Sequence, residues 1–328
     1  LSAFAAKHKK TILEELEQPI EIQGDVGSDP PSDYTTDEDS HTNKIVAIGR
    51  QLRNITLSTW QPTATNVLED TKSVKRIRLK ARQTITYIGI YDLLVVKGAI
   101  TIYGAVLTAD NGSQQVFAPS THALPNIKCL SREAEVQIKH VPGNGLTSLK
   151  MFSPLYGRFW NHRTKENITQ LANGQPDRRS FSLLRASNND GLKRDLVDLN
   201  FDSTWNKPID ELVSSSNPPI VLVCGPKSSG KSTFCRILSN RLLSGGQGNS
   251  YKAIWHLDLD SAVPEYTLPG QISISEITGM NLGPPYTHLV LNGNVSRVAL
   301  PVAATDFRDR PEYFLTLVDH LVKHSIGS

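Results

Sequence analysis

At 328 residues the chain is longer than the roughly 250 to 300 residues at which single hydrophobic cores stop growing, so its length favours two domains. Hydrophobic residues make up 38% and charged residues 20%, which is typical of globular proteins, and a net charge of +3 does not by itself indicate a nucleic-acid partner. Three cysteines without metal-ligand spacing favour a reducing compartment over a disulfide framework. No apolar run approaches the ~18 residues of a membrane-spanning helix, and we expect no signal peptide.

Residues 1–44 are predicted to be an acidic, disordered segment. Ten acidic residues lie between Glu14 and Asp39, and no lysine or arginine lies between Lys10 and Lys44. Much of this stretch has almost no aliphatic side chains, so folding cannot bury enough surface to offset the entropy of ordering it. A solvated tail is the simpler interpretation, and shielding of a basic groove is the alternative.

Short β-rich runs separated by turn-forming glycines follow, and they predict a small antiparallel β-sandwich domain over residues 45–155. One of these runs carries alternating basic residues, namely Lys75, Arg76, Arg78, Lys80 and Arg82. A solvated sheet face is the simpler interpretation of that run, and contact with phosphates is the alternative. Residues 156–216 are polar and basic, and we predict a connector there with a helix at 204–214.

A different pattern begins at residue 217. The apolar run 220–224 predicts a strand buried on both faces of a parallel sheet. It leads directly into GPKSSGKS at 225–232, which fits the P-loop pattern G-x-x-x-x-G-K-[ST], and residues 233–243 have the apolar spacing of a helix. We therefore predict an α/β P-loop domain over 217–328, with a parallel sheet and flanking helices.

The P-loop predicts a site for a nucleoside triphosphate. Its glycines let successive N–H groups point at phosphates, and the positive end of the following helix lies beside them. Lys231 is predicted to reach the β- and γ-phosphates, and the Ser232 hydroxyl to ligate Mg²⁺. The predicted ATP-binding residues are Gly225, Pro226, Lys227, Ser228, Ser229, Gly230, Lys231, Ser232 and Thr233.

Two carboxylates, Asp258 and Asp260, end the next predicted strand at 253–260. The two-residue period of a strand places both on one face, at the edge where α/β sheets bind ligands. We expect one of them to hold Mg²⁺, directly or through water, and to accept the proton of an attacking hydroxyl. A solvated strand end is the alternative.

The motifs resemble those of the eukaryotic polynucleotide 5′-hydroxyl kinases, and within that family the nucleolar branch that processes pre-rRNA. The matching segments are GPKSSGKSTFCRILSNRLL, HLDLD, PEYTLPGQISI and LGPPYTH, with KGAITIYGAVL and VFAPSTHALPNI in the first predicted domain. They span most of residues 84–314, and the form GPK-x-SGKSTF is specific to this group. The resemblance implies an ATP-dependent transferase, a kinase that phosphorylates the 5′-hydroxyl end of RNA.

The resemblance also assigns roles to residues at matching positions. Lys231 and Asp260 would be catalytic, with Asp260 as the base and Asp258 as a supporting acid, and Ser232 and Asp260 would hold the metal. Thr287 and His288 match a motif that in the family lies near the RNA side of the cleft, and a structural role is the alternative for both. Lys227 would either touch phosphate or be solvated.

The family context implies a HEPN-type endoribonuclease partner whose cut leaves a 5′-hydroxyl end. It also implies a place in the nucleus, in the nucleolus, and a part in rRNA processing and ribosome biogenesis, with no membrane partner. The sequence departs from the family at Ser261, Ala262 and Val263, where much of the family has a Gly and a Gln. No lid arginine is identifiable after His288, so we expect the kinase domain to be C-terminally incomplete. The alternatives are an ATP-binding scaffold subunit with weak or no kinase activity, and the pre-mRNA cleavage-factor branch.

Overall fold

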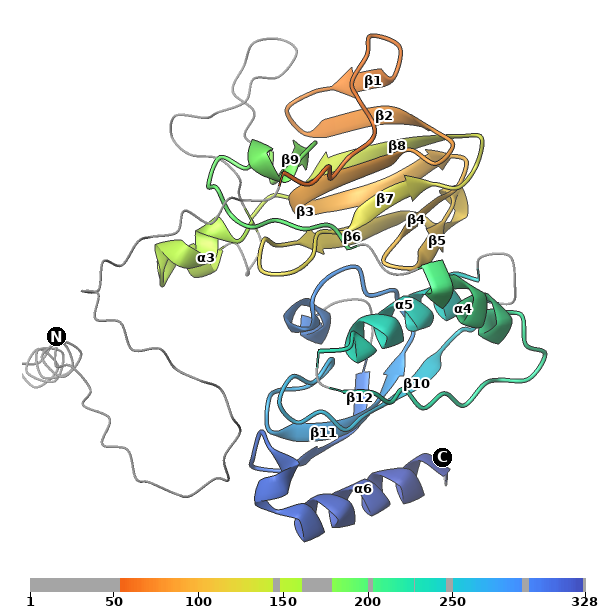
Figure 1. Ribbon diagram of the computed structural model, residues 1–328, viewed down its shortest axis with the longest axis vertical. Coiled ribbons are helices and arrows are strands. Elements are labelled where there is room, and N and C mark those ends of the chain that lie inside the picture. The colour runs from red at the N-terminus through yellow and green to blue at the C-terminus, as the bar shows by residue number, and fades with distance from the viewer. Residues whose placement is uncertain are drawn as a thin grey trace, which may run out of the picture. The chain divides into compact units, whose positions relative to one another are not determined.

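The computed structural model describes residues 54–143, 148–160, 179–199, 203–226, 228–245, 250–290 and 295–326. The predicted acidic segment 1–44 lies outside these residues. Gln51–Ser328 forms one compact unit, in which the described strands make two separate sheets (Figure 1). The described part of the chain contains no helix long and apolar enough to cross a bilayer. The predicted division into a β domain, a connector and a kinase domain stays a prediction.

The first sheet is antiparallel at every described pairing. Its order is β1-β2-β8-β3-β7-β4-β5, and β6 and β9 also pair with β3. The strands are β1 (Val67–Asp70), β2 (Val74–Lys80), β3 (Thr84–Lys97), β4 (Ile100–Ile102), β5 (Ala105–Leu107), β6 (Ser113–Ala118), β7 (Asn126–Cys129), β8 (Glu133–His140) and β9 (Phe181–Leu184). That this sheet closes into a sandwich stays a prediction.

Strand β3 changes its neighbours at Gly89. Its first half pairs with β7 and β9, and its second half pairs with β6 and β8. Gly89 has φ +121°, and a Cβ there would lie 2.1 Å from the Ser180 carbonyl oxygen. Glycine is therefore required where the long strand meets the chain that leads into β9.

The core of the first sheet follows the two-residue period of its strands. Ile77 and Leu79 of β2 are fully buried, while Arg76 and Arg78 alternate with them. Both arginines form ion pairs with Glu135 of β8, at 2.8 and 3.0 Å. Much of the basic charge of β2 is therefore compensated within the sheet, which weakens the alternative that this run contacts phosphates.

Part of the predicted connector belongs to the first sheet, because β9 pairs with β3. Helix α3 (Pro154–Arg158) lies across the predicted start of the connector at residue 156, and α4 (Asn206–Val213) forms where the sequence predicts a helix. Short 3-10 helices occur at Ala109–Asn111, Leu149–Met151, Ser187–Asn189, Ser203–Trp205, Pro285–Val290 and Phe307–Asp309.

The second sheet corrects the prediction of a parallel arrangement. It consists of β10 (Ile254–Asp258), β11 (Gln271–Ile277) and β12 (Val295–Pro301), paired antiparallel in that order. Parallel neighbours need a crossover that returns the chain to the same end of the sheet, usually through a helix. Here residues 259–270 form a loop, so the chain reverses direction between β10 and β11.

The apolar run 220–224 also differs from its prediction, because it forms no strand in the described structure. Ile220 is fully exposed and Leu222 is 85% exposed. A strand buried on both faces needs hydrogen-bonded neighbours, and within the described residues no strand pairs with this run.

The two long helices α5 and α6 pack against different elements. Helix α5 (Lys231–Ser244) packs on α4 through a cluster that contains Ile237 and Leu242. Helix α6 (Pro311–Ile326) packs through Leu321 against Ile272 and Ile274 of β11.

Helix α5 also lies on the turn between β4 and β5. Tyr103 and Gly104 both have positive φ, +48° and +80°, as in a tight hairpin turn. Asn240 Nδ2 donates to the Tyr103 carbonyl at 2.9 Å, and Arg241 Nε donates to the Gly104 carbonyl at 2.8 Å. The helix that follows the glycine loop is thus attached to the first sheet.

Candidate nucleotide and catalytic site

The glycine loop leads directly into the N-terminus of α5. Gly230 has φ +87°, the left-handed conformation that glycine adopts readily, and the helix begins at Lys231. The Phe234 amide donates to the Gly230 carbonyl at 2.8 Å, which closes the first turn. Trp205 lies against the loop, since a Cβ on Gly230 would be 3.2 Å from its ring. The arrangement places the positive end of a helix at the loop, as an anion site requires.

Lys231 turns its side chain back over the loop. Its Nζ donates to the Pro226 carbonyl at 2.7 Å. Ser232 is exposed beside it, and Thr233 is partly buried. Ser228 has φ +63°, which shows that the loop holds a non-glycine residue in the left-handed region. Among the predicted phosphate-binding residues, Lys227 lies outside the described residues.

Asp258 and Asp260 differ in their surroundings more than their spacing suggests. Asp258 is the last residue of β10 and is buried, whereas Asp260 lies beyond the strand and is exposed. The two-residue period that would place them on one face therefore ends at Asp258. The carboxylate of Asp260 accepts from the amides of Ala262 and Val263 at 2.9 and 3.2 Å, so it orders the loop that follows.

The Asp258 carboxylate holds that loop against the strand end. Its Oδ1 accepts from the Asp260 amide at 3.0 Å, and its Oδ2 accepts from the Glu265 amide at 2.7 Å. Burial raises the pKa of Asp258, and these two amides oppose the rise by stabilising the charged form. The arrangement suits Asp258 to support the loop and leaves Asp260 accessible.

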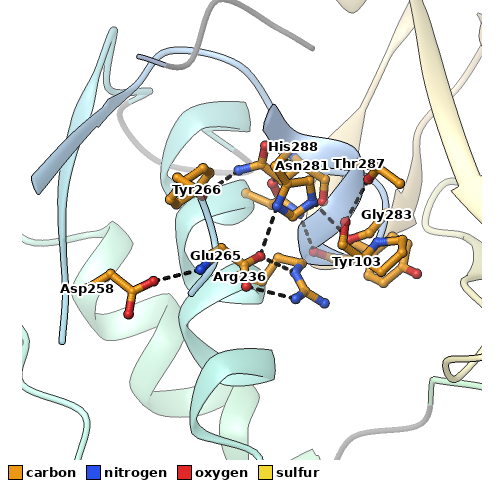
Figure 2. Close-up of polar contacts among 11 residues, drawn as sticks. Tyr103, Arg236, Asp258, Glu265, Tyr266, Asn281, Gly283, Thr287 and His288 are labelled. Atoms are coloured by element: carbon orange, nitrogen blue, oxygen red, sulfur yellow. Dashed lines mark hydrogen bonds and ion pairs between the residues drawn. The ribbon is translucent and has the colours of Figure 1, made fainter. Parts of the chain in front are cut away.

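A buried polar network lies between α5, the loop after β10 and the segment 281–288 (Figure 2). Arg236 of α5 forms a bidentate ion pair with Glu265, with Nε and Nη2 at 2.7 and 2.9 Å from the two carboxylate oxygens. His288 Nδ1 lies 3.0 Å from Glu265 Oε1, and its Nε2 is 3.0 Å from the Gly283 carbonyl. Glu265 is thus held from two segments.

Burial by itself would raise the pKa of Glu265, but the contact with His288 and the guanidinium of Arg236 outweigh it. Together they lower the pKa to about 2. Burial opposes the charge of Arg236 too, yet the same carboxylate raises the pKa of that guanidinium above its ordinary value. Both members of the buried pair are therefore charged at neutral pH.

Thr287 and His288, the residues expected near RNA, are both buried, at 2% and 4% exposure. Thr287 Oγ1 donates to the Pro284 carbonyl at 2.7 Å, and His288 belongs to the network. Their segment touches the first sheet, since the Phe117 amide donates to the Leu282 carbonyl at 2.9 Å. In the structure both side chains hold this segment in place, and a role toward RNA stays a prediction.

Sequence reasoning did not single out Arg236, Glu265, Asn240 or Asn281. One signal was available in α5. Arg236 and Asn240 are four residues apart and share a face next to the buried Ile237. Polar side chains at that spacing beside a core residue indicate a partner across the helix face, because buried polar groups are almost always hydrogen-bonded.

Comparison with known proteins identifies the relatives of this chain. Residues 225–326 match the family described as the mRNA cleavage and polyadenylation factor CLP1 P-loop. The polynucleotide 5′-hydroxyl-kinase grc3 of Aspergillus niger is 32% identical over 318 residues, which cover 92% of this chain and 38% of that protein. The kinase of the same name from Emericella nidulans is 35% identical over 272 residues, 79% of this chain and 33% of that protein.

Among solved structures, a chain of the wild-type Clp1p–Pcf11p complex is similar with a TM-score of 0.45 and 14% identity, covering 79% of this chain and 50% of that one. The present chain spans 38% and 33% of the lengths of these two kinases. The matched family model alone covers the glycine loop, α5, the strand end at Asp258 and α6, within residues 225–326. The chain belongs to the polynucleotide 5′-hydroxyl-kinase family, with a P-loop of the CLP1 type.

Proposed function

We propose that the protein containing this chain transfers the γ-phosphate of ATP to the 5′-hydroxyl end of RNA. The observation that carries the proposal is the glycine loop that turns at Gly230 into the N-terminus of α5. It occurs in a chain 32 to 35% identical to proteins named polynucleotide 5′-hydroxyl-kinase. The loop supports binding of a triphosphate, and the relatives support the choice of acceptor.

The roles of the residues follow from phosphoryl transfer. The 5′-oxygen of RNA attacks the γ-phosphorus, the bond to the bridging oxygen of ADP breaks, and the hydroxyl proton passes to a carboxylate. Lys231 supplies positive charge where negative charge develops, and its present bond to the Pro226 carbonyl would be exchanged for phosphate. Asp260 is the accessible carboxylate, and two backbone amides fix its orientation.

The donor set fits Mg²⁺. The ion prefers oxygen ligands, and phosphate-bound Mg²⁺ is held by one or two carboxylates rather than by an all-protein cage. Ser232 and Asp260 would supply the protein oxygens, and both are exposed in the structure. When bound, the ion would neutralise charge on the phosphates.

A second function belongs to another class, an ATP-binding scaffold subunit of an RNA-processing complex with weak or no kinase activity. It is favoured by Ser261, Ala262 and Val263, which replace the Gly and Gln expected from the family. The pre-mRNA cleavage-factor branch is the other alternative, since the matched P-loop family carries that description.

One experiment separates kinase from scaffold. The intact protein is incubated with γ-labelled ATP and an RNA that carries a 5′-hydroxyl end, and a matched RNA with a 5′-phosphate serves as the control. Label at the 5′ end of the first RNA alone supports the kinase. Binding of ATP without label on either RNA contradicts it and supports the scaffold.

The cellular context is also part of the proposal. The resemblance of the motifs supports a nucleolar protein of rRNA processing and ribosome biogenesis, acting with a HEPN-type endoribonuclease. Cleavage by such a nuclease leaves the 5′-hydroxyl end that the kinase needs. Affinity purification of the tagged protein at its native level tests this. Recovery of a HEPN nuclease and spacer RNA is the expected result, and recovery of mRNA cleavage factors instead would place the protein in the other branch.

A further inference from the structure

Glu265 joins the helix after the glycine loop to the acidic strand end. Its carboxylate accepts hydrogen bonds from Nε and Nη2 of Arg236 in α5, at 2.7 and 2.9 Å. Its backbone amide donates to Asp258 Oδ2 at 2.7 Å. One residue therefore contacts α5 through its carboxylate and the end of β10 through its main chain, and it is 6% exposed (Figure 2).

The helix end of this connection is rigid. Arg236 and Lys231 belong to the same unbroken helix, whose first turn is closed by the bond from Phe234 to Gly230. An α-helix fixes the position of each residue relative to its neighbours through its backbone hydrogen bonds. The guanidinium of Arg236 therefore keeps a fixed relation to the start of the helix, where Lys231 lies.

The strand end of the connection is a loop whose shape depends on a few contacts. Asp258 accepts from the amides of Asp260 and Glu265, and Asp260 accepts from those of Ala262 and Val263. These bonds shape the loop internally. The Arg236–Glu265 pair joins the shaped loop to α5.

We propose that the ion pair between Arg236 and Glu265 is a positioning device for the reaction. It sets Asp260 at the distance from Lys231 that phosphoryl transfer needs, without touching ATP or RNA itself. This rests on the proposed kinase function. A misplacement of about 1 Å in a catalytic group reduces turnover strongly while binding of the substrate is largely kept, so the pair acts on kcat more than on ATP affinity.

The bidentate geometry is what suits this pair to the task. Two parallel N–H···O bonds from a planar guanidinium fix both the distance and the angle of the carboxylate. His288 Nδ1 lies 3.0 Å from Glu265 Oε1 and adds a contact from another segment of the chain. Arg236→Lys would keep the positive charge and lose the two parallel N–H donors, so it separates the effect of bidentate geometry from that of charge attraction.

The test compares Glu265→Gln with Asp210→Asn in the intact protein. Asp210 of α4 pairs with Arg241 of α5 at 3.0 Å, so its substitution removes an ion pair to the same helix without reaching the loop after β10. Amide hydrogen exchange measures the loop, while kcat per folded molecule and the Kd for ATP measure the site. Arg236→Lys is the second variant, because it keeps both charges and is expected to fold.

In Glu265→Gln the amides of Asp260, Ala262 and Val263 should exchange about tenfold faster or more, while the Phe234 amide in α5 is unchanged. The value of kcat should fall at least about tenfold, with ATP affinity within about threefold of the unsubstituted protein. The exchange rates and kcat of Arg236→Lys should lie between those of Glu265→Gln and the unsubstituted protein. Asp210→Asn should match the unsubstituted protein in loop exchange, kcat and ATP affinity.

Unchanged exchange in the loop would overturn the positioning role. Faster exchange with an unchanged kcat per folded molecule would overturn its link to the reaction. If Glu265→Gln and Asp210→Asn lower kcat equally, the loss comes from general destabilisation and not from the position of the loop. If the unsubstituted protein does not phosphorylate RNA, the proposed function fails, and the link to the reaction fails with it, while the exchange data still decide whether the pair holds the loop.

Discussion

Asn240 and Asn281 are joined by two hydrogen bonds. The Asn281 amide donates to Asn240 Oδ1 at 2.7 Å, and Asn240 Nδ2 donates to the Asn281 carbonyl at 3.0 Å. The same Nδ2 group reaches the Tyr103 carbonyl at 2.9 Å. Asn240 is fully buried, so one side chain satisfies the backbone of two distant segments.

Replacing Asn240 by Ala should lower the free energy of unfolding by about 2 to 4 kcal/mol, because several buried backbone groups lose their partners together. Urea unfolding measures this change. Lys323→Ala is the control, since its ion pair with Asp319 is exposed and should change stability by less than about 0.5 kcal/mol. Equal effects of the two substitutions would show that the asparagine bonds do not stabilise the fold.

Gly89→Ala should destabilise the first sheet by more than about 3 kcal/mol. The added Cβ would lie 2.1 Å from the Ser180 carbonyl oxygen, and φ of +121° is unfavourable for alanine. Gly112→Ala is the matched control, with φ +65° and no heavy atom within 4 Å of the new Cβ, and should cost about 1 kcal/mol. Thermal or urea unfolding of both variants tests the difference, which a similar loss in each would contradict.

The stability contributed by Glu265 should depend on pH. Its pKa in the folded protein is about 2, below its ordinary value of 4.5, because the contact with His288 and the charge of Arg236 outweigh burial. A depressed pKa stabilises the fold above the unfolded value, and this contribution is lost as the pH falls from about 4.5 toward 2. The full contribution is about 3 kcal/mol.

The measurement is the difference in free energy of unfolding between the unsubstituted protein and Glu265→Gln, taken from pH 7 down to pH 3. The difference should be constant near neutral pH and shrink below about 4.5. Glu211→Gln is the control, because that carboxylate lies 4.0 Å from Lys207 on an exposed face of α4. A difference that stays constant over the whole range would contradict the depressed pKa.

Lys231→Ala should reduce kinase turnover at least about a hundredfold, because it removes a cation from the position where charge develops. Asp260→Asn should still allow ATP to bind and yet slow the chemistry. Steady-state kinetics with 5′-hydroxyl RNA, together with ATP binding measured by calorimetry, separates these effects. Full activity in Lys231→Ala would refute the kinase assignment, and unchanged rates in Asp260→Asn would move the base to another residue.

The sequence was sufficient to locate the glycine loop and α5, because both depend on local rules. Glycine positions fix the left-handed turn at Gly230, and apolar spacing fixes the helix. The prediction of a parallel second sheet was wrong, because the sequence of a strand does not reveal which strand it pairs with or in which direction. The failed strand at 220–224 has the same cause: apolar composition predicts burial, but pairing depends on neighbours that lie elsewhere in the chain.

The buried network was missed for a different reason. Arg236 and Glu265 are 29 residues apart, and Asn240 and Asn281 are 41 apart. Periodicity describes one element at a time and carries no information on contacts at that separation. The prediction that Asp258 and Asp260 share one strand face was wrong for a local reason. The two-residue period holds only while the strand continues, and β10 ends at Asp258.

The attachment of α5 to the β4–β5 turn has a consequence for how the chain is assembled. Tyr103 and Gly104, whose carbonyls accept from Asn240 and Arg241, leave the ribosome well before that helix does. All strands of the first sheet likewise precede α5 in the chain, so the sheet can pair before the helix is synthesised. Helix α5, which begins at the glycine loop, therefore docks on a turn that belongs to the earlier half of the same chain.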